Sequence, residues 1–441
     1  MTRHYLLLTA LFVFCGAAAA GTAEQSQRKQ VAGIDVITYR TEVKNVVVIL
    51  GSLPAGDAMG DTGNIAVPTL TGMMLDRGTK ALDKFAIAEK LDNVGAEISF
   101  SVGTETLEMR AKCLKKDLPL IVGLIAAQLR TPAFQLPEFN KAKEQFVGAL
   151  QASAQNTEAR AQEAFGRAAF PAGHPNHPHL VREYEAAAKA ATLEELKTFY
   201  AKTYGPAHMT LIVVGDVDAA RAQAEIGKAF DGWSGGRDYV RPAAPAAVTA
   251  SSVVPVPLAD KPSVSMILGQ PSGLRYKDPD TLALRMGTAI LGHGFTGRLM
   301  GTVRDKEGLT YSIGANMAED SIVDGSWYIA ASFAPALLEK GLASTRRELD
   351  KWWQDGITDQ ELAARKQGIV GGYLVGLSTT AGVATALLSD IQRGYDISWL
   401  EGYPAALKAL TRDQVNGAIK RHLNPNAMVL VEAGSIPPAV H

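Results

Sequence analysis

The chain repeats a segment of its own sequence, and this repeat limits what it can fold into. The stretch ATLEELKTFYAKTYGPAHMTLIVVGDVD near residues 191–218 returns as LTRDQVNGAIKRHLNPNAMVLVEAGSI near residues 410–436. Thr192 and Thr411 are each followed three residues later by Glu or Gln, which is the pattern of a helix capping box. Both copies therefore predict a helix, a turn at a proline, and a strand that ends at a glycine.

A second repeated pair lies earlier in each copy. VVVILGS at residues 46–52 resembles VSMILGQ at residues 264–270, at nearly the same offset as the first pair. Repeats with a constant offset indicate two copies of one domain, each of about 200 residues. Because each copy contains both strands and helices, the sequence predicts an α+β fold in which helices pack on a sheet.

The segment between the two copies has a different composition. GRDYVRPAAPAAVTASS, from Gly236 to Ser252, is rich in Pro, Ala and Ser and is typical of a linker. The predicted organisation is an N-terminal domain at residues 30–235, a linker at 236–252 and a C-terminal domain at 253–436.

The first residues have the features of an export signal. Arg3 supplies a positive start, Tyr5 to Phe14 form an apolar run too short to span a bilayer, and Ala17 to Ala20 offer small residues for cleavage. We therefore expect residues 1–20 to be a secretory signal and the mature protein to be exported, in the periplasm. No later apolar run is long enough to cross a membrane.

Cysteine content and charge narrow the classes of function. Cys15 could be lipidated, although Phe14 before it is bulky where a lipoprotein signal needs a small residue, so this alternative stays open. Removal of the signal leaves only Cys113, which excludes an internal disulfide and a cysteine-based zinc site. The formal net charge is −1, so no basic excess indicates a nucleic-acid partner.

A glycine-rich motif and a histidine-rich motif each have an ordinary alternative. Gly292, Gly294 and Gly297 have the spacing of a dinucleotide-binding loop, but the preceding residues have helical periodicity where that loop needs a strand. A connection between two helices is the favoured interpretation. In GHPNHPHL, His174 to His179 could bind a metal, but the prolines indicate an extended surface loop without a nearby acid to orient the rings. Metal-dependent chemistry at this loop stays open as a further hypothesis for the function of the chain.

The segment from Thr296 to Ala315 predicts a helix followed by a strand. Arg304 lies in the last turn of the helix and Gly308 just after it, whereas Tyr311 lies at the start of the strand. Arg304 could simply stabilise the helix end and Tyr311 could simply pack. Alternatively, the two side chains meet and donate hydrogen bonds to a substrate carbonyl and its oxyanion. The residues alone leave both interpretations open.

This segment resembles a motif of the pitrilysin/insulinase family of zinc peptidases, the inverted zincins. The second domain of that family carries a glycine-rich turn, then S/T-x-R-L and V-R-E-x-x-G-L-x-Y-S, which correspond here to residues 292–299 and 303–312. The segment at residues 91–105 is similar to the family's substrate-lining strand. The resemblance covers essentially the whole mature chain, and it implies two homologous domains in tandem that form half of a clamshell.

The zinc-binding motif of that family is missing. In the family, a helix carrying H-x-x-E-H runs into Gly-Thr, matched here by residues 78–79, and a third ligand Glu follows about 75 residues later. This correspondence puts Thr69 and Met73 in the two His positions, Gly72 in the Glu position and Ala149 near the third ligand. None of these side chains suits Zn²⁺. Gly72 also costs a helix on the order of 1 kcal/mol relative to Ala, which suggests a close approach or a kink there.

The family contains two-subunit members in which one chain has H-x-x-E-H and a homologous chain lacks it. The resemblance implies that this chain is the second kind: a non-catalytic, substrate-binding subunit of an exported zinc endopeptidase. It would form a heterodimer with a zinc-bearing homologue, hold no cofactor of its own, bind peptides, and supply Arg304 and Tyr311 to the partner's zinc site. We expect no peptidase activity from the chain alone. The alternative is a catalytically inert peptide-binding or scaffolding protein of the same fold.

Overall fold

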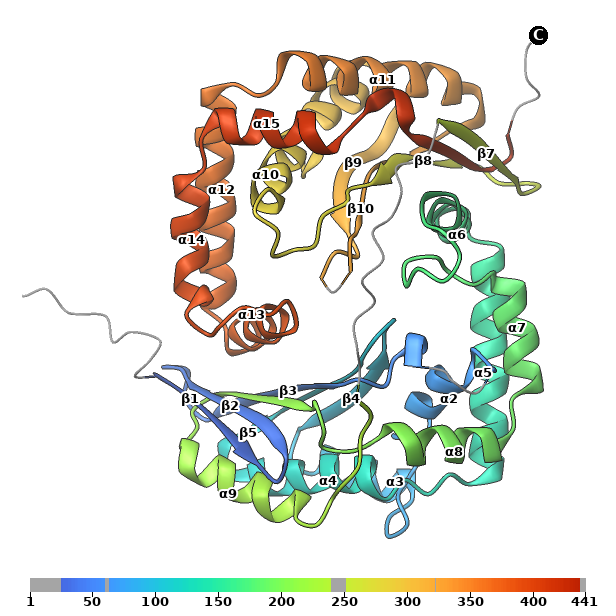
Figure 1. Ribbon diagram of the computed structural model, residues 1–441. Helices are drawn as coiled ribbons and strands as arrows, with labels where there is room; N and C mark the ends of the chain where they lie inside the picture. Colours follow the sequence, from blue (N-terminus) through green and yellow to red (C-terminus); the bar gives the residue numbers. More distant parts are fainter. Residues whose placement is uncertain (1–24, 60–62, 239–250, 322, 437–441) are drawn as a thin grey trace, which may run out of the picture.

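The computed structural model describes residues 25–59, 63–238, 251–321 and 323–436. The expected signal at residues 1–20 and most of the expected linker therefore lie outside the described residues. The chain folds into two halves, each built around its own β-sheet, and the two sheets face each other across the middle of the molecule (Figure 1).

The N-terminal half contains a six-stranded sheet with the order β1-β2-β6-β3-β5-β4. Neighbouring strands are antiparallel except β2 and β6, which run parallel. The first strand begins at Ser26, before the expected domain boundary at residue 30. The bounds are β1 Ser26–Val31, β2 Ile34–Arg40, β3 Val46–Leu53, β4 Glu97–Val102, β5 Leu107–Leu114 and β6 Thr210–Gly215.

The C-terminal half contains a five-stranded sheet with the order β7-β11-β8-β10-β9. It has the same topology as the first sheet without β1, because β7 and β11 run parallel and every other pair is antiparallel. The repeated segments form equivalent strands in the two sheets, so the predicted duplication of an α+β domain is confirmed. The bounds are β7 Ser252–Pro257, β8 Val264–Pro271, β9 Thr310–Ala318, β10 Ser326–Phe333 and β11 Val429–Gly434.

The helices also follow each other in the same order in the two halves. The predicted capping boxes form at Thr192 and Thr411, where each Thr hydroxyl accepts a hydrogen bond from the backbone three residues on. The N-terminal half contains α2 Val67–Met73, α3 Lys84–Asp92, α4 Leu118–Arg130, α5 Leu136–Ala154, α6 Thr157–Ala169, α7 Val181–Ala190, α8 Leu193–Thr203 and α9 Ala219–Phe230. The C-terminal half contains α10 Thr281–Gly292, α11 Leu338–Asp355, α12 Asp359–Leu377, α13 Thr380–Gln392, α14 Trp399–Ala409 and α15 Arg412–His422.

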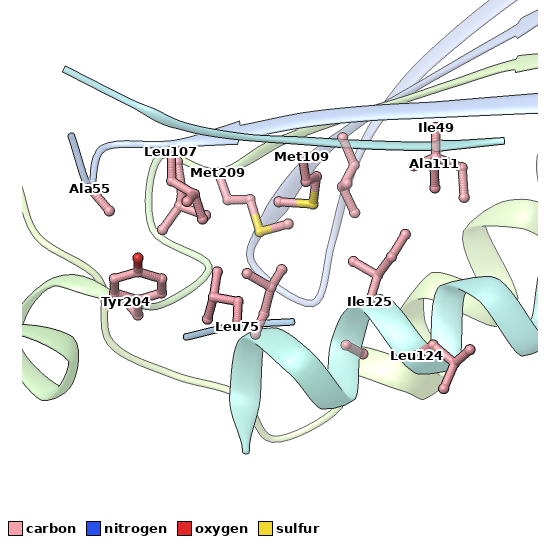
Figure 2. Close-up of a cluster of buried hydrophobic side chains, with 14 of the residues drawn as sticks. Ile49, Ala55, Leu75, Leu107, Met109, Ala111, Leu124, Ile125, Tyr204 and Met209 are labelled. Atoms are coloured by element: carbon pink, nitrogen blue, oxygen red, sulfur yellow. The ribbon is translucent and has the colours of Figure 1, made fainter. Parts of the chain in front are cut away.

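One face of each sheet is covered by helices of the same half. Figure 2 shows part of the N-terminal core, where Met109 and Met209 fill the space between the sheet and Ile125 of α4. In the C-terminal core, the indole rings of Trp327 and Trp352 stack 5.9 Å apart. Each half therefore has an extensive apolar core of its own.

The opposite face of each sheet is covered by a helix from the other half (Figure 1). Helix α13 packs Leu387 into a cluster with Ile212 and Val214 of the N-terminal sheet. Helix α6 packs Phe165 into a cluster with Val431 of the C-terminal sheet. This exchange explains why the central strands read as continuous apolar runs without alternation, since both of their faces are buried.

No single helix of the described residues is long and apolar enough to cross a membrane. Helices α12 and α13 meet that test only when taken together, and the chain bends by 112° between them.

Candidate functional site

Helix α2 contains three of the residues that the resemblance puts in the zinc-binding and general-base positions. It begins at Val67, with Pro68 in its first turn, where a proline costs no hydrogen bond. The side chains of Val67 and Leu70 are fully buried, and the Thr71 hydroxyl donates to the backbone oxygen of Val67 at 2.7 Å. Burial of an apolar face thus holds this short helix in place without any metal.

Thr69, the first expected histidine position, belongs to a small polar network. Its hydroxyl donates to Oδ1 of Asp57 at 2.7 Å, and the Tyr184 hydroxyl donates to Oδ2 of the same carboxylate at 3.2 Å. Burial raises the pKa of Asp57 above its usual value, although both hydroxyl groups and the nearby His179 oppose the rise. The polar group at this position is therefore engaged with a carboxylate, and it offers no ring nitrogen for a metal.

Gly72, the expected position of the general base, is buried against strand β4. A Cβ atom added here would lie 2.2 Å from Cγ2 of Val102 and 3.2 Å from Cδ1 of Leu107. The sequence suggested a close approach or a kink at this glycine, and the close approach is confirmed. Val102 fills the space that a carboxylate side chain would need.

The other two expected positions also lack metal ligands. Met73 is partly buried against the N-terminal core, and Ala149 is exposed on α5. Within the described ranges, no group of three or more His, Cys, Asp or Glu side chains is arranged to hold a metal ion. A hydroxyl, a thioether and two positions without donor atoms do not fit Zn²⁺, so no catalytic step in this chain is assigned to zinc.

Arg304 lies in an unusual helix. Residues Met300–Lys306 form a π-helix, which follows the glycine-rich turn and is capped by Glu307. Gly308 then takes a φ of +64°, as a residue after a helix commonly does. The Arg304 side chain is 30% exposed, and its guanidinium carbon lies 5.4 Å from the ring centroid of Tyr311. The helix end and the strand start therefore bring the two side chains together.

Tyr311 lies in a β-bulge on an edge strand. The pairing of β9 with β10 shifts register between Ala331 and Phe333, so Tyr311 and Ser312 together face one residue of β10. Bulges of this kind redirect a side chain away from the regular pleat. The Tyr311 side chain is 86% exposed. Its phenol is thus presented to solvent at the edge of the C-terminal sheet.

Phe295 completes the cluster, and the sequence interpretation missed it. The Arg304 guanidinium carbon lies 5.3 Å from its ring centroid, and Phe295 is 75% exposed. An arginine beside two aromatic rings is held by cation–π attraction. The sequence did contain a signal for Phe295, because a short glycine-rich turn rarely needs a large apolar side chain for packing.

The glycine-rich turn itself joins two helical segments, as expected. Helix α10 ends at Gly292, where an added Cβ would lie 2.2 Å from the backbone nitrogen of Ala315 on β9. Gly297 also packs against Gly292, where an added Cβ would lie 2.9 Å from the Gly292 Cα. These glycines allow helix and strand to approach each other, and no strand precedes them as a dinucleotide loop requires.

The histidine-rich loop was wrongly interpreted as a surface loop without a nearby acid. The His174 side chain is fully buried, and its Nε2 lies 3.0 Å from Oδ1 of Asp324 in the turn between β9 and β10. The backbone N–H of Asn176 donates to Nδ1 of the same ring, so the proton lies on Nε2 and is donated to Asp324. His177 contacts the backbone oxygen of Phe170 at 2.8 Å, and these contacts give the loop a structural role between the halves.

A large cavity lies beside this loop and was not visible in the sequence. Its volume is about 1090 Å³. The Thr69 network reaches its wall through Asp57 and Tyr184, and the C-terminal half contributes Glu319 and Ser326. A cavity between the two halves is thus linked to Thr69 through the hydrogen bonds of Asp57.

Comparisons with known proteins agree with this geometry. The family model described as the peptidase M16 inactive domain matches residues 190–369. The non-peptidase homologue YmxG of Helicobacter pylori is 21% identical over 431 residues, which covers 96% of each chain. A protein of Streptomyces coelicolor described as an uncharacterised zinc protease is 24% identical over 354 residues, which covers 79% of this chain and 76% of the relative.

Solved structures show the same fold. A peptidase M16 inactive domain from Pseudomonas fluorescens superposes with a TM-score of 0.85 at 24% identity, covering 94% of this chain and all of that one. The periplasmic protease PqqL of Escherichia coli gives a TM-score of 0.77 at 15% identity. This chain covers 49% of PqqL, so the match corresponds to about half of that protein.

The duplicated sheet-and-helix fold is that of a solved peptidase M16 inactive domain, and the described residues of this chain contain no group of three or more side chains that could hold a metal ion. Residues 190–369 match the model of the peptidase M16 inactive domain, and nearly the whole chain resembles a solved domain of that description, so the comparisons support the resemblance to inactive members of the pitrilysin/insulinase family.

Proposed function

We propose that this protein is the non-catalytic, substrate-binding subunit of an exported heteromeric zinc endopeptidase. Its partner is a homologous chain with an intact H-x-x-E-H motif, which supplies the zinc, the water and the general base. This chain supplies Arg304 and Tyr311, which orient the scissile carbonyl of a peptide and stabilise its oxyanion. The exposed Arg304–Tyr311 pair is the observation that carries the proposal.

Exposure of the pair supports a role outside this chain. A phenol that is 86% exposed buries little apolar surface here and contributes little to the stability of the fold. Within the described residues, the only ion-pair partner of Arg304 is its chain neighbour Asp305, at 3.6 Å. Its guanidinium can therefore turn its donors to a substrate carbonyl, and the two ring contacts limit the conformations it must lose.

The first half supports the same division of labour. Val102 occupies the space beside Gly72, so the zinc position is closed by packing as well as emptied of ligands. The duplicated fold, in contrast, is preserved throughout both sheets. Preservation of a whole scaffold without its metal site favours binding and assembly as the role of this chain. Export is supported by the predicted signal at residues 1–20 and by the likeness of the fold to a periplasmic protease.

The test reconstitutes the pair. The purified chain is mixed with the H-x-x-E-H homologue from the same organism, and cleavage of a fluorogenic peptide library is measured with Arg304→Ala and Tyr311→Phe. Loss of one oxyanion donor is expected to lower kcat by about 10²–10³-fold. Arg412→Ala is the matched control, because Arg412 is an exposed arginine that pairs with Asp359 on the outer surface of α12 and α15.

Each result decides between the hypotheses. Full activity of both variants refutes the role of the pair, and zinc bound stoichiometrically to this chain alone refutes the assignment of the metal to the partner. If the chain forms no complex with the homologue and yet binds peptides by itself, it is the inert peptide-binding protein of the alternative hypothesis.

A further inference from the structure

One acidic and one basic residue, Asp390 and Arg393, line a cavity that the proposed function does not use. The cavity has a volume of about 450 Å³ and lies among α12, α13, α14 and the loop before α10. Its walls include the rings of Tyr276, Tyr373 and Tyr403 and the small side chains of Ala381 and Ala386. This size is suited to a small organic ligand.

Asp390 is the acidic group of this cavity. The residue is only 8% exposed, yet none of the described residues donates a hydrogen bond or forms an ion pair with its carboxylate. Burial raises the pKa of Asp390 to about 6, against the opposing charge of Arg393. Burying a carboxylate without a partner is unfavourable. A cationic group of a ligand would therefore bind favourably beside this carboxylate in the cavity wall, because it would supply the missing partner.

Arg393 is the basic group, and it is held away from Asp390. Residues three apart near a helix end are neighbours, so these two could pair. Instead, the Arg393 guanidinium carbon lies 3.7 Å from the ring centroid of Tyr276, and its Nε donates to Oγ of Ser321 at 3.2 Å. No ion pair to Arg393 forms within the described residues. One face of the cavity thus carries a negative and a positive group that are close together but not joined.

We propose that this cavity binds the zwitterion of a free α-amino acid. The ligand ammonium donates to the Asp390 carboxylate, and the ligand carboxylate accepts from the Arg393 guanidinium. A simple amine would leave Arg393 unmatched and a simple carboxylate would leave Asp390 unmatched. In an α-amino acid the two charges are separated by a single carbon, which suits neighbouring side chains. The ligand side chain then lies against Tyr373 and Tyr403, which favours an apolar or aromatic one.

The test is a calorimetric titration of the purified chain without any partner, so its outcome is independent of the proposed peptidase role. L-Alanine, L-leucine and L-phenylalanine are the probes, and we expect saturable binding of one molecule per chain, tightest for leucine or phenylalanine. The methyl ester and the N-acetyl form of the best probe each lack one charge. Each is expected to bind at least about tenfold more weakly, the effect of one charge-assisted hydrogen bond.

Two variants test the named residues. Asp390→Asn and Arg393→Gln are each expected to weaken binding by at least about tenfold, whereas Asp396→Asn, an exposed aspartate on the same loop, should bind like the natural chain. The analogue titrations use the unaltered protein, so they decide the question even if a variant fails to fold. Absence of saturable binding by all three amino acids overturns the proposal. Equal binding of the ester, or an equal loss in Asp396→Asn, overturns it as well.

Discussion

Replacement of Gly72 by alanine tests whether close packing against Val102 requires a glycine at this position. The new Cβ would lie 2.2 Å from Cγ2 of Val102, whereas carbon atoms in contact prefer about 3.5–4.0 Å. Val102 must move by more than about 1 Å, and overpacking of this kind typically costs about 1–3 kcal/mol. Alanine offsets part of that cost, since it is better than glycine in a helix by about 1 kcal/mol. We expect Gly72→Ala to destabilise the protein by up to about 2 kcal/mol.

A double-mutant cycle separates the two contributions. In a Val102→Ala background the close contact is gone, and the remaining neighbour, Cδ1 of Leu107 at 3.2 Å, needs to shift by only a few tenths of an ångström. The same Gly72→Ala change should then be neutral or should stabilise the protein by up to about 1 kcal/mol. The sign of the effect therefore depends on Val102, with an interaction energy of about 1–3 kcal/mol.

The four proteins are compared by urea unfolding, monitored by far-ultraviolet circular dichroism. Equal destabilisation by Gly72→Ala in both backgrounds would contradict packing against Val102 as the reason for the glycine. Stabilisation in the natural background would show that helix propensity outweighs the contact.

Four further predictions follow from contacts described above. Leu387→Ala on α13 should lower the free energy of unfolding by about 2–5 kcal/mol and should speed amide hydrogen exchange in β3 and β6 of the other half. The control Leu374→Ala, at a residue that is 54% exposed, should change the free energy of unfolding by no more than about 0.5 kcal/mol. Faster hydrogen exchange only in the C-terminal half would contradict the packing of α13 on the N-terminal sheet. His174→Ala removes the hydrogen bond to Asp324 and should lower the unfolding free energy by about 1–3 kcal/mol in chemical denaturation, a loss that an exposed His179→Ala should not reproduce. Burial would raise the pKa of Glu361, but hydrogen bonds from Arg298 and Thr358 lower it to about 2. The ionised carboxylate therefore stabilises the fold fully above the unfolded pKa of about 4.3, and this stabilisation is lost as the pH falls through 2. The destabilisation caused by Arg298→Ala should shrink between about pH 5 and pH 2.5 in urea titrations, and a destabilisation that stays the same at both pH values would contradict this role of Glu361. Burial, with a smaller contribution from Asp117, raises the pKa of the Cys113 thiol to about 12. In a chain without the signal segment, a thiol reagent at about pH 8 should therefore react far more slowly with the native protein than with the unfolded one. Equal reaction rates would contradict the burial of this thiol.

The sequence predicted the duplicated fold well because the repeated residues are those that the topology requires. A capping Thr begins the same helix in both halves, and the apolar runs VVVILGS and VSMILGQ are the central strands of the two sheets. The juxtaposition of Arg304 and Tyr311 was also foreseeable, since only a short turn separates the helix from the strand. Local sequence patterns were sufficient to predict structure where the contacting residues are close in sequence or where a segment repeats at a constant offset.

Contacts between distant segments were not predictable in this way. His174 was interpreted as exposed because no acid lies nearby in the sequence, whereas its partner Asp324 is 150 residues away. Leu387 on α13 packs on the sheet of the other half, and the pattern of its own helix contains no signal for that partner. Phe295 and the Asp390 cavity likewise depend on how loops from different elements come together.

The exchange of α6 and α13 has a consequence for how such a chain could arise. A single half whose helix covers the sheet of a second, identical copy is a domain-swapped dimer with two-fold symmetry. If the genes of the two copies are joined, both exchanged helices become internal to one polypeptide, as α6 and α13 are here. Each copy is then free to diverge, because its neighbour continues to complete its core. A first copy whose described residues hold no metal-ligand group, beside a second copy with an exposed Arg–Tyr pair, is the kind of specialisation that such a fused ancestor permits.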